Sequence, residues 1–107
     1  MLKSGCMAHT LTAPEALAWY FKRRAAFVKD ICHHVFFANR NRGVDRKFHA
    51  GYAIQAMAEP ARVNAFLLQQ ADTLVLDTTM RAALENDAAE MRACSTRMRA
   101  YLADSWA

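Results

Sequence analysis

The chain of 107 residues is about one domain long and carries a net charge of +4, with 54% hydrophobic residues. Charged residues recur every few positions, so no segment stays apolar for long enough to cross a bilayer. Only three Gly and two Pro interrupt the chain, which favours helix over sheet. We therefore expect an all-α fold, a compact bundle of about four helices, with a single helical domain over residues 12–107 behind a flexible tail of residues 1–11.

The first helix begins with a strong capping signal. In the stretch Thr12-Ala13-Pro14-Glu15, the Thr12 side chain can accept from the Glu15 amide while Glu15 reaches back, and Pro14 fits the first turn. This helix should continue to about Asn39. At about 100° per residue, one side collects the residues that we expect in the core: Leu17, Phe21, Val28, Ile31, Cys32 and Val35. Arg24 falls among them and needs a partner or a path to solvent.

The opposite side of this helix carries an unexpected pair of aromatic residues. Trp19 and Phe37 lie there, about five turns apart, among charged residues that include Arg23. Either the helix is buried on two sides within the bundle, or this side is a surface for a second protein chain. In the second interpretation, aromatics rimmed by basic residues are the expected anchors.

A second helix is expected over residues 45–59, with Asp45 as its cap. Pro60 should interrupt it, and a third helix should follow over residues 61–74. Residues 73–76 could instead form a short strand. The second helix is apolar nearly all round, so Ile54 and Met57 are further candidates for partner or dimer contacts.

The fourth helix should start at Asp77 or Thr78 and reach about Ala103. Its expected core stripe consists of Met80, Leu84, Met91, Cys94, Met98 and Leu102. Methionine at this spacing is typical of plastic core packing and not of a copper or haem site.

The sequence from Cys32 to Arg40 groups three possible metal ligands. Adjacent helical residues diverge by about 100°, so Cys32, His33 and His34 cannot converge on one ion. Asp30 has the spacing to share an ion with His33 or His34, but one carboxylate and one imidazole do not make a site unless His49 or His9 approaches from elsewhere. We therefore expect no metal and no cofactor, with Asp30 paired to His33 or His34 at the surface.

The turn between the first two helices is basic. Arg40, Arg42, Arg46 and Lys47 are possible nucleic-acid contacts, and a nucleic-acid-binding helical protein is the alternative function. The segment matches no known nucleic-acid-binding motif, and acidic residues are mixed with the basic ones.

Neither catalysis nor secretion is indicated. The chain has no Gly-rich phosphate loop, no nucleophile motif and no HExxH, so we expect no enzymatic activity. No hydrophobic segment of signal length precedes Cys6, and three cysteines far apart fit reduced thiols, so we expect a cytoplasmic protein.

The stretches Trp19-Tyr20-Phe21-Lys22-Arg23-Arg24 and Cys32-His33-His34-Val35-Phe36-Phe37 carry a resemblance to a known family. In size and general character the chain resembles the small helical anti-activators of bacterial quorum sensing. The resemblance implies a regulatory protein that binds a LuxR-type transcription regulator and blocks its dimerisation and DNA binding. From the apolar surfaces we further expect a homodimer. The predicted partner or dimer contacts are Trp19, Arg23, Phe37, Ile54 and Met57.

Overall fold

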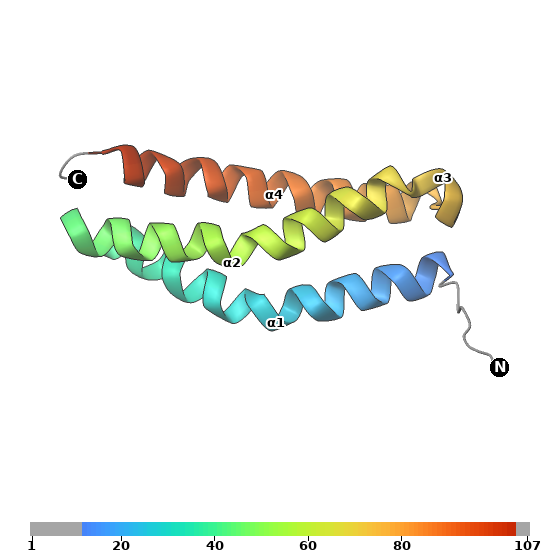
Figure 1. The fold of residues 1–107 in the computed structure, drawn as a ribbon, viewed down its shortest axis with the longest axis horizontal. Coiled ribbons are helices and arrows are strands. Elements are labelled where there is room, and N and C mark those ends of the chain that lie inside the picture. The colour runs from blue at the N-terminus through green and yellow to red at the C-terminus, as the bar shows by residue number, and fades with distance from the viewer. Residues whose placement is uncertain (1–11, 105–107) are drawn as a thin grey trace.

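The computed structural model describes residues 12–104, which form three long helices and one short helix (Figure 1). These are α1 (Ala13–Arg40), α2 (Gly43–Gln69), α3 (Ala71–Leu74) and α4 (Thr78–Ala103). The expected all-α fold is confirmed, and the alternative of a strand over residues 73–76 is wrong. The tail predicted over residues 1–11 lies outside the described residues. Within residues 12–104, no helix is both long and apolar enough to pass through a membrane.

Two of the helix starts follow the sequence prediction. At α1, the backbone N–H of Thr12 donates to Glu15 Oε1 at 2.8 Å, and the Glu15 N–H donates to Thr12 Oγ1 at 3.3 Å. At α4, Asp77 Oδ1 accepts from the Met80 N–H at 2.8 Å. Both caps satisfy amides that the helix itself leaves without a partner, which explains why they can be recognised in the sequence.

The start of α2 differs from the prediction. The helix begins at Gly43, with Arg42 at the N-cap position and no side-chain cap, and Asp45 lies within the first turn. Gly43 has a φ of 59°, a left-handed conformation that glycine adopts without steric cost. The glycine therefore reverses the chain and lets α2 begin two residues before Asp45.

The predicted break at Pro60 is also wrong, because α2 continues through this residue to Gln69. Proline removes one backbone donor and its ring crowds the carbonyl four residues earlier, which bends a helix when packing holds it together. Pro60 is buried, and α2 changes direction near its middle (Figure 1). The tertiary contacts on both sides of α2 thus keep as one helix what the sequence suggested were two.

The arrangement of the helices is elongated and thin. α2 lies between α1 and α4 and packs along both, whereas α1 and α4 meet at only a few points (Figure 1). The structure measures 57 × 29 × 18 Å with a radius of gyration of 17.1 Å, against about 13 Å for a compact domain of roughly 100 residues. The three long helices therefore leave much of their side-chain surface uncovered.

The core consists of two clusters of buried residues along α2. One cluster contains Ala38, Ala50, Ala53, Met57, Met91 and Met98. The other contains Ala16, Tyr20, Leu67 and Leu84. Alanines on α1 and α2 allow close approach of the two helices, while methionines from α4 fill the remaining irregular space. The predicted methionine packing of α4 is confirmed, although Leu102 is exposed.

The core side of α1 is rotated relative to the prediction. Its buried residues are Ala13, Ala16, Tyr20 and Ala38. Phe21 and Cys32, which we expected in the core, are exposed. The half-buried residues are Leu17, Val28, Ile31 and Val35. The reason is that α1 packs mainly on α2 through small residues, while the larger apolar side faces the gap toward α4, where contacts are few.

Candidate functional site

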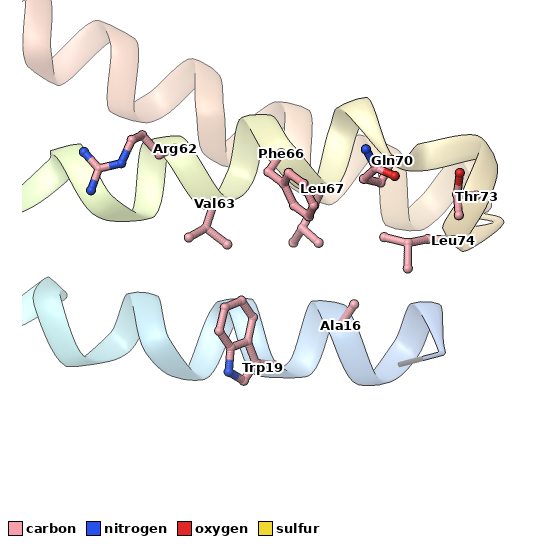
Figure 2. Close-up of a pocket in the computed structure, with 9 residues that line it drawn as sticks. All are labelled: Ala16, Trp19, Arg62, Val63, Phe66, Leu67, Gln70, Thr73 and Leu74. Carbon is pink, nitrogen blue, oxygen red and sulfur yellow. The ribbon is translucent and has the colours of Figure 1, made fainter. Parts of the chain in front are cut away.

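An apolar groove lies between the N-terminal half of α1 and the C-terminal end of α2 with α3. It has a volume of about 520 Å³. We call it the apolar groove, and its lining residues are Ala16, Trp19, Arg62, Val63, Phe66, Leu67, Gln70, Thr73 and Leu74. In Figure 2, Ala16 points from α1 toward the side chains of α2 and α3, and the Trp19 ring lies across α1 at the side of the groove. A concave apolar surface of this volume falls within the range of ligand and partner sites.

Local sequence spacing explains how the groove forms. Val63, Phe66, Leu67 and Gln70 are three or four residues apart, so they share one side of α2. Opposite them, Ala16 is too small to fill the space between the helices. Leu67 is buried and closes the floor, whereas Phe66 is 57% exposed at the wall.

Trp19 forms the opposite wall of the groove, and Arg23 on the same helix contacts its ring. Its side chain is 44% exposed, and the guanidinium carbon of Arg23 lies 5.4 Å from the centre of the indole ring. Arg23 Nη2 lies 2.8 Å from Glu59 Oε2 on α2, which ties the two helices at this end of the groove. The ion pair is exposed and contributes little to stability, but it orients Arg23 against the indole.

A second unusual surface lies where α1 ends and α2 begins. We call it the aromatic patch, and its members are His33, His34, Phe36, Phe37, Phe48, His49 and Tyr52. The Phe37 ring stacks on His49 at 5.3 Å, and the His34 ring stacks on Tyr52 at 5.3 Å. Phe36, Phe37, Phe48 and Tyr52 are all exposed. An exposed group of rings this large is unusual for a surface facing only solvent.

Two histidines link α1 and α2 within the patch. His34 Nδ1 and His49 Nδ1 lie 2.9 Å apart, so one ring donates a proton to the other and the pair cannot hold a proton on both atoms. Burial lowers the pKa of His34 below its ordinary value of 6.5, and the neighbouring His49 and His33 lower it further, while Asp30 opposes them. His34 therefore favours its neutral state in the folded protein.

This arrangement predicts a pH-dependent stability. Because the pKa of His34 is lower in the folded state, the unfolded chain binds the proton more readily, and the free energy of unfolding should fall as the pH drops below about 6.5. We expect His34→Phe, which keeps a ring against Tyr52, to reduce the difference in urea stability between pH 7.5 and pH 5.5. Equal losses of stability in the variant and the natural protein would contradict this assignment.

The same geometry bears on the metal interpretation. His49 does approach His34, as a metal site would have required, but within residues 12–104 no three His, Cys, Asp or Glu side chains are placed to hold an ion. His34 has His49 as its hydrogen-bond partner. Asp30, which we expected to pair with His33 or His34, acts on His34 through its charge.

The predicted contact residues fall into three different settings. Trp19 and Arg23 lie at the apolar groove, and Phe37, 37% exposed, lies in the aromatic patch. Met57 is 4% exposed within the core, and Ile54 is half-buried against the same cluster. We correct the prediction for Met57, because its face of α2 is covered by the other helices and is not open to a partner.

Phe66, Val63 and Leu74 were missed as site residues. Their apolar spacing was visible, but it lay in a segment interpreted as a separate short helix after Pro60. Continuity of α2 is what brings them opposite Trp19.

The basic turn is partly used inside the molecule. The Arg46 Nε–H donates to the Ala38 carbonyl at 3.1 Å and to the Asn41 carbonyl at 2.6 Å. The guanidinium carbon of Arg40 lies 4.0 Å from the centre of the Phe36 ring. These contacts give both arginines a structural role at the turn. Nucleic-acid contact by Arg40, Arg42, Arg46 and Lys47 stays a prediction.

A buried polar network connects α1, α2 and α4 behind the groove. The Tyr20 hydroxyl donates to Asp87 Oδ2 at 2.5 Å, and Asn64 Nδ2 donates to the Tyr20 oxygen at 3.3 Å and to the Leu84 carbonyl at 2.9 Å. Arg24 Nε lies 2.7 Å from Asp87 Oδ1, without the alignment of a hydrogen bond. This contact answers the expectation that Arg24 needs a partner.

Burial and the Asp87 contact raise the pKa of Tyr20 to about 12. A strongly shifted pKa can mark a catalytic group, but Tyr20 does not line the apolar groove and is almost fully buried. Tyr20 follows Trp19 and Asn64 follows Val63 in the sequence, so the network fixes the backbone beneath both walls of the groove.

No protein-family model, curated protein or solved structure matches this chain. Inference of function therefore rests on the apolar groove, the aromatic patch and their chemistry.

Proposed function

We propose that this chain is a small helical regulatory protein that binds a transcription regulator through the apolar groove and blocks the regulator's dimerisation and DNA binding. The supporting observation is the groove itself, with Trp19 and Phe66 exposed on opposite walls. Large aromatic side chains beside a hollow are typical anchors for a protein partner, since burying them excludes water from much apolar area.

The dimensions of the groove fit an amphipathic helix. On α2 the lining residues run from Arg62 to Gln70, about 12 Å at 1.5 Å per residue, and Thr73 and Leu74 of α3 extend this wall. About three turns of a partner helix, with apolar residues at positions i, i+3, i+4 and i+7, would cover this length. Arg62 places a positive charge at the edge, which favours an acidic residue at the rim of the partner helix.

Blocking of dimerisation follows from competition for one helix. A regulator that dimerises through an amphipathic helix buries the same apolar side that the groove would bind. While the helix lies in the groove, it is not free for the second regulator subunit, and a regulator that reads DNA as a dimer then loses affinity for its site. The resemblance to quorum-sensing anti-activators, with their LuxR-type targets, supports this choice of partner.

The proposal can be tested with a purified LuxR-type regulator from the same genome. The binding of the regulator to a fluorescent duplex containing its site is measured by anisotropy while this protein is added. We expect the protein to lower the anisotropy, and the Trp19→Ala/Phe66→Ala variant to require at least about a tenfold higher concentration, because each buried anchor contributes 1 kcal/mol or more.

Phe21→Ala is the matched control, because Phe21 is an exposed aromatic on α1 that does not line the groove. It should inhibit as well as the natural protein. If the natural protein changes neither the DNA binding nor the mass of the regulator, the proposed partner class is wrong.

A further inference from the structure

Four of the exposed aromatics of α1 and α2 form two pairs with the same spacing in the sequence. Trp19 and Phe37 are 18 residues apart on α1, and Phe48 and Phe66 are 18 residues apart on α2. Eighteen residues make about five full turns, so each pair lies on one side of its helix, with its members separated by about 27 Å. In both pairs one member belongs to the apolar groove and the other to the aromatic patch.

The four side chains therefore lie on one face of the α1–α2 pair, and the two ends of this face differ in shape. α1 and α2 run antiparallel, as the contacts Arg23–Glu59 and His34–His49 show at two levels. The groove lies at the level of Trp19 and Phe66, where the surface is hollow. The patch lies at the level of Phe37 and Phe48, where aromatic rings stand exposed.

We propose that a second copy of this chain packs antiparallel on this α1–α2 face, so that the aromatic patch of each copy fills the apolar groove of the other. A two-fold axis across the middle of the face places Trp19 of one copy opposite Phe37 of the other. The same axis places Phe66 opposite Phe48. The contact between groove and patch thus occurs twice in the dimer, once on each side of the axis, as an isologous interface requires.

The size of the face suits a stable dimer. Two adjacent helices are about 20 Å wide, and the distance of about 27 Å between the anchors, extended by a turn at each end, gives roughly 800 Å² per copy. This is about the area that each partner contributes to a standard protein interface. In a single copy, α1 and α4 have few contacts and the molecule is thin. Packing against a second copy adds a second layer of helices.

Charge does not oppose the contact. The middle of the face carries Lys22, Arg23, Asp30 and Glu59, so both signs are present where the two copies cross. The outer side of α4 offers no comparable surface, because its exposed residues include Ala82, Ala89, Ala93 and Ala100, and Leu102 is its one exposed large apolar side chain within residues 78–103.

The dimer does not depend on the proposed regulator binding, but it would compete with it, because both occupants use the apolar groove. A partner would then have to separate or displace the second copy. Loss of self-association with retained regulator binding, or the reverse, tells the two ideas apart.

The first measurement is the mass in solution by light scattering over a range of concentrations. We expect twice the chain mass of 12.1 kDa, falling toward one chain on dilution. A mass of one chain at all concentrations up to about 100 times the lowest would overturn the inference.

The second measurement tests the antiparallel arrangement by disulfide cross-linking. In a full-length background with Cys6, Cys32 and Cys94 replaced by serine and checked for helical content, Lys22→Cys and His33→Cys are introduced singly and together. Both residues are exposed, and they are 11 residues apart, about 16 Å along one helix, so they cannot bridge within a chain.

The antiparallel face brings Lys22 of one copy near His33 of the other, since both lie at similar distances from the proposed axis. We expect a covalent dimer only when both cysteines are present. Efficient cross-linking of either single variant would show a parallel arrangement. A dimer by mass without any cross-link in the double variant would place the interface on another face. Either result overturns the inference.

Discussion

Replacement of Asp87 by alanine is expected to lower the free energy of unfolding by about 3 kcal/mol or more. Asp87 is 7% exposed and contacts both the Tyr20 hydroxyl and the Arg24 guanidinium. Its removal leaves a buried hydroxyl without an acceptor and a largely buried charge without a partner. The Arg24 side chain keeps 27% exposure, which places the expected loss at the lower end for a broken buried ion pair.

Urea unfolding followed by far-UV circular dichroism at pH 7 measures this loss. Asp87→Asn should lose less than Asp87→Ala, because the amide oxygen still accepts from Tyr20 while the charge is removed. Glu85→Ala is the matched control, because Glu85 is an exposed acid on the same helix, and its effect should stay within about 0.5 kcal/mol. A loss below about 1 kcal/mol for Asp87→Ala would show that the network contributes little to stability.

The network also explains why the groove can remain open. An empty apolar hollow gives its walls little support from packing, so another interaction must hold α1 and α2 at their separation. Tyr20 and Asn64 supply it directly behind Trp19 and Val63. Because each polar group has one geometry in which it is satisfied, the network fixes the relative position of the helices more narrowly than apolar contacts would.

Local features of the fold were predictable from sequence, because their causes are local. The Thr12–Glu15 capping box and the Asp77 cap involve residues three positions apart, and the structure confirms both. The continuity of α2 through Pro60 was not predictable, because tertiary packing offsets the missing hydrogen bond. The start of α2 at Gly43 was also missed. The helix begins with a left-handed backbone conformation at Gly43 and not with the expected cap from the Asp45 side chain.

The core side of α1 shows a limit of helical periodicity. The pattern identified an apolar stripe, but the helix buries Ala16 and Ala38, whose small size lets α2 approach. Tyr20 is buried because its hydroxyl finds Asp87, which is 67 residues away in the sequence. No periodic pattern reveals such a partner, so the polar centre of the protein could not be predicted.

Part of the candidate site could be predicted from the sequence. Trp19 and Phe37 could be recognised as candidate contact residues, because large aromatic residues are not expected on the polar side of a helix in a simple bundle. The groove opposite Trp19 could not, because its other wall comes from residues 62–74, whose position depends on the path of α2 and α3.

The double substitution Trp19→Ala/Phe37→Ala should leave the helical content unchanged while self-association falls at least 100-fold. Neither side chain belongs to the two core clusters, so the fold does not depend on them. In the antiparallel dimer each Trp19 faces Phe37 of the other copy, and each buried aromatic contributes on the order of 2 kcal/mol, or about 30-fold in affinity. The two effects need not add, because the residues contact each other across the interface.

Sedimentation equilibrium gives the dissociation constant, and far-UV circular dichroism gives the helical content of the same samples. Phe21→Ala removes an exposed aromatic ring from the other side of α1 and should leave the dissociation constant within about threefold of the natural value. Loss of helical content in the double variant would mean that Trp19 and Phe37 support the fold itself. Unchanged association with an intact fold would remove both residues from the interface, and the groove would then be available to a partner without competition from a second copy.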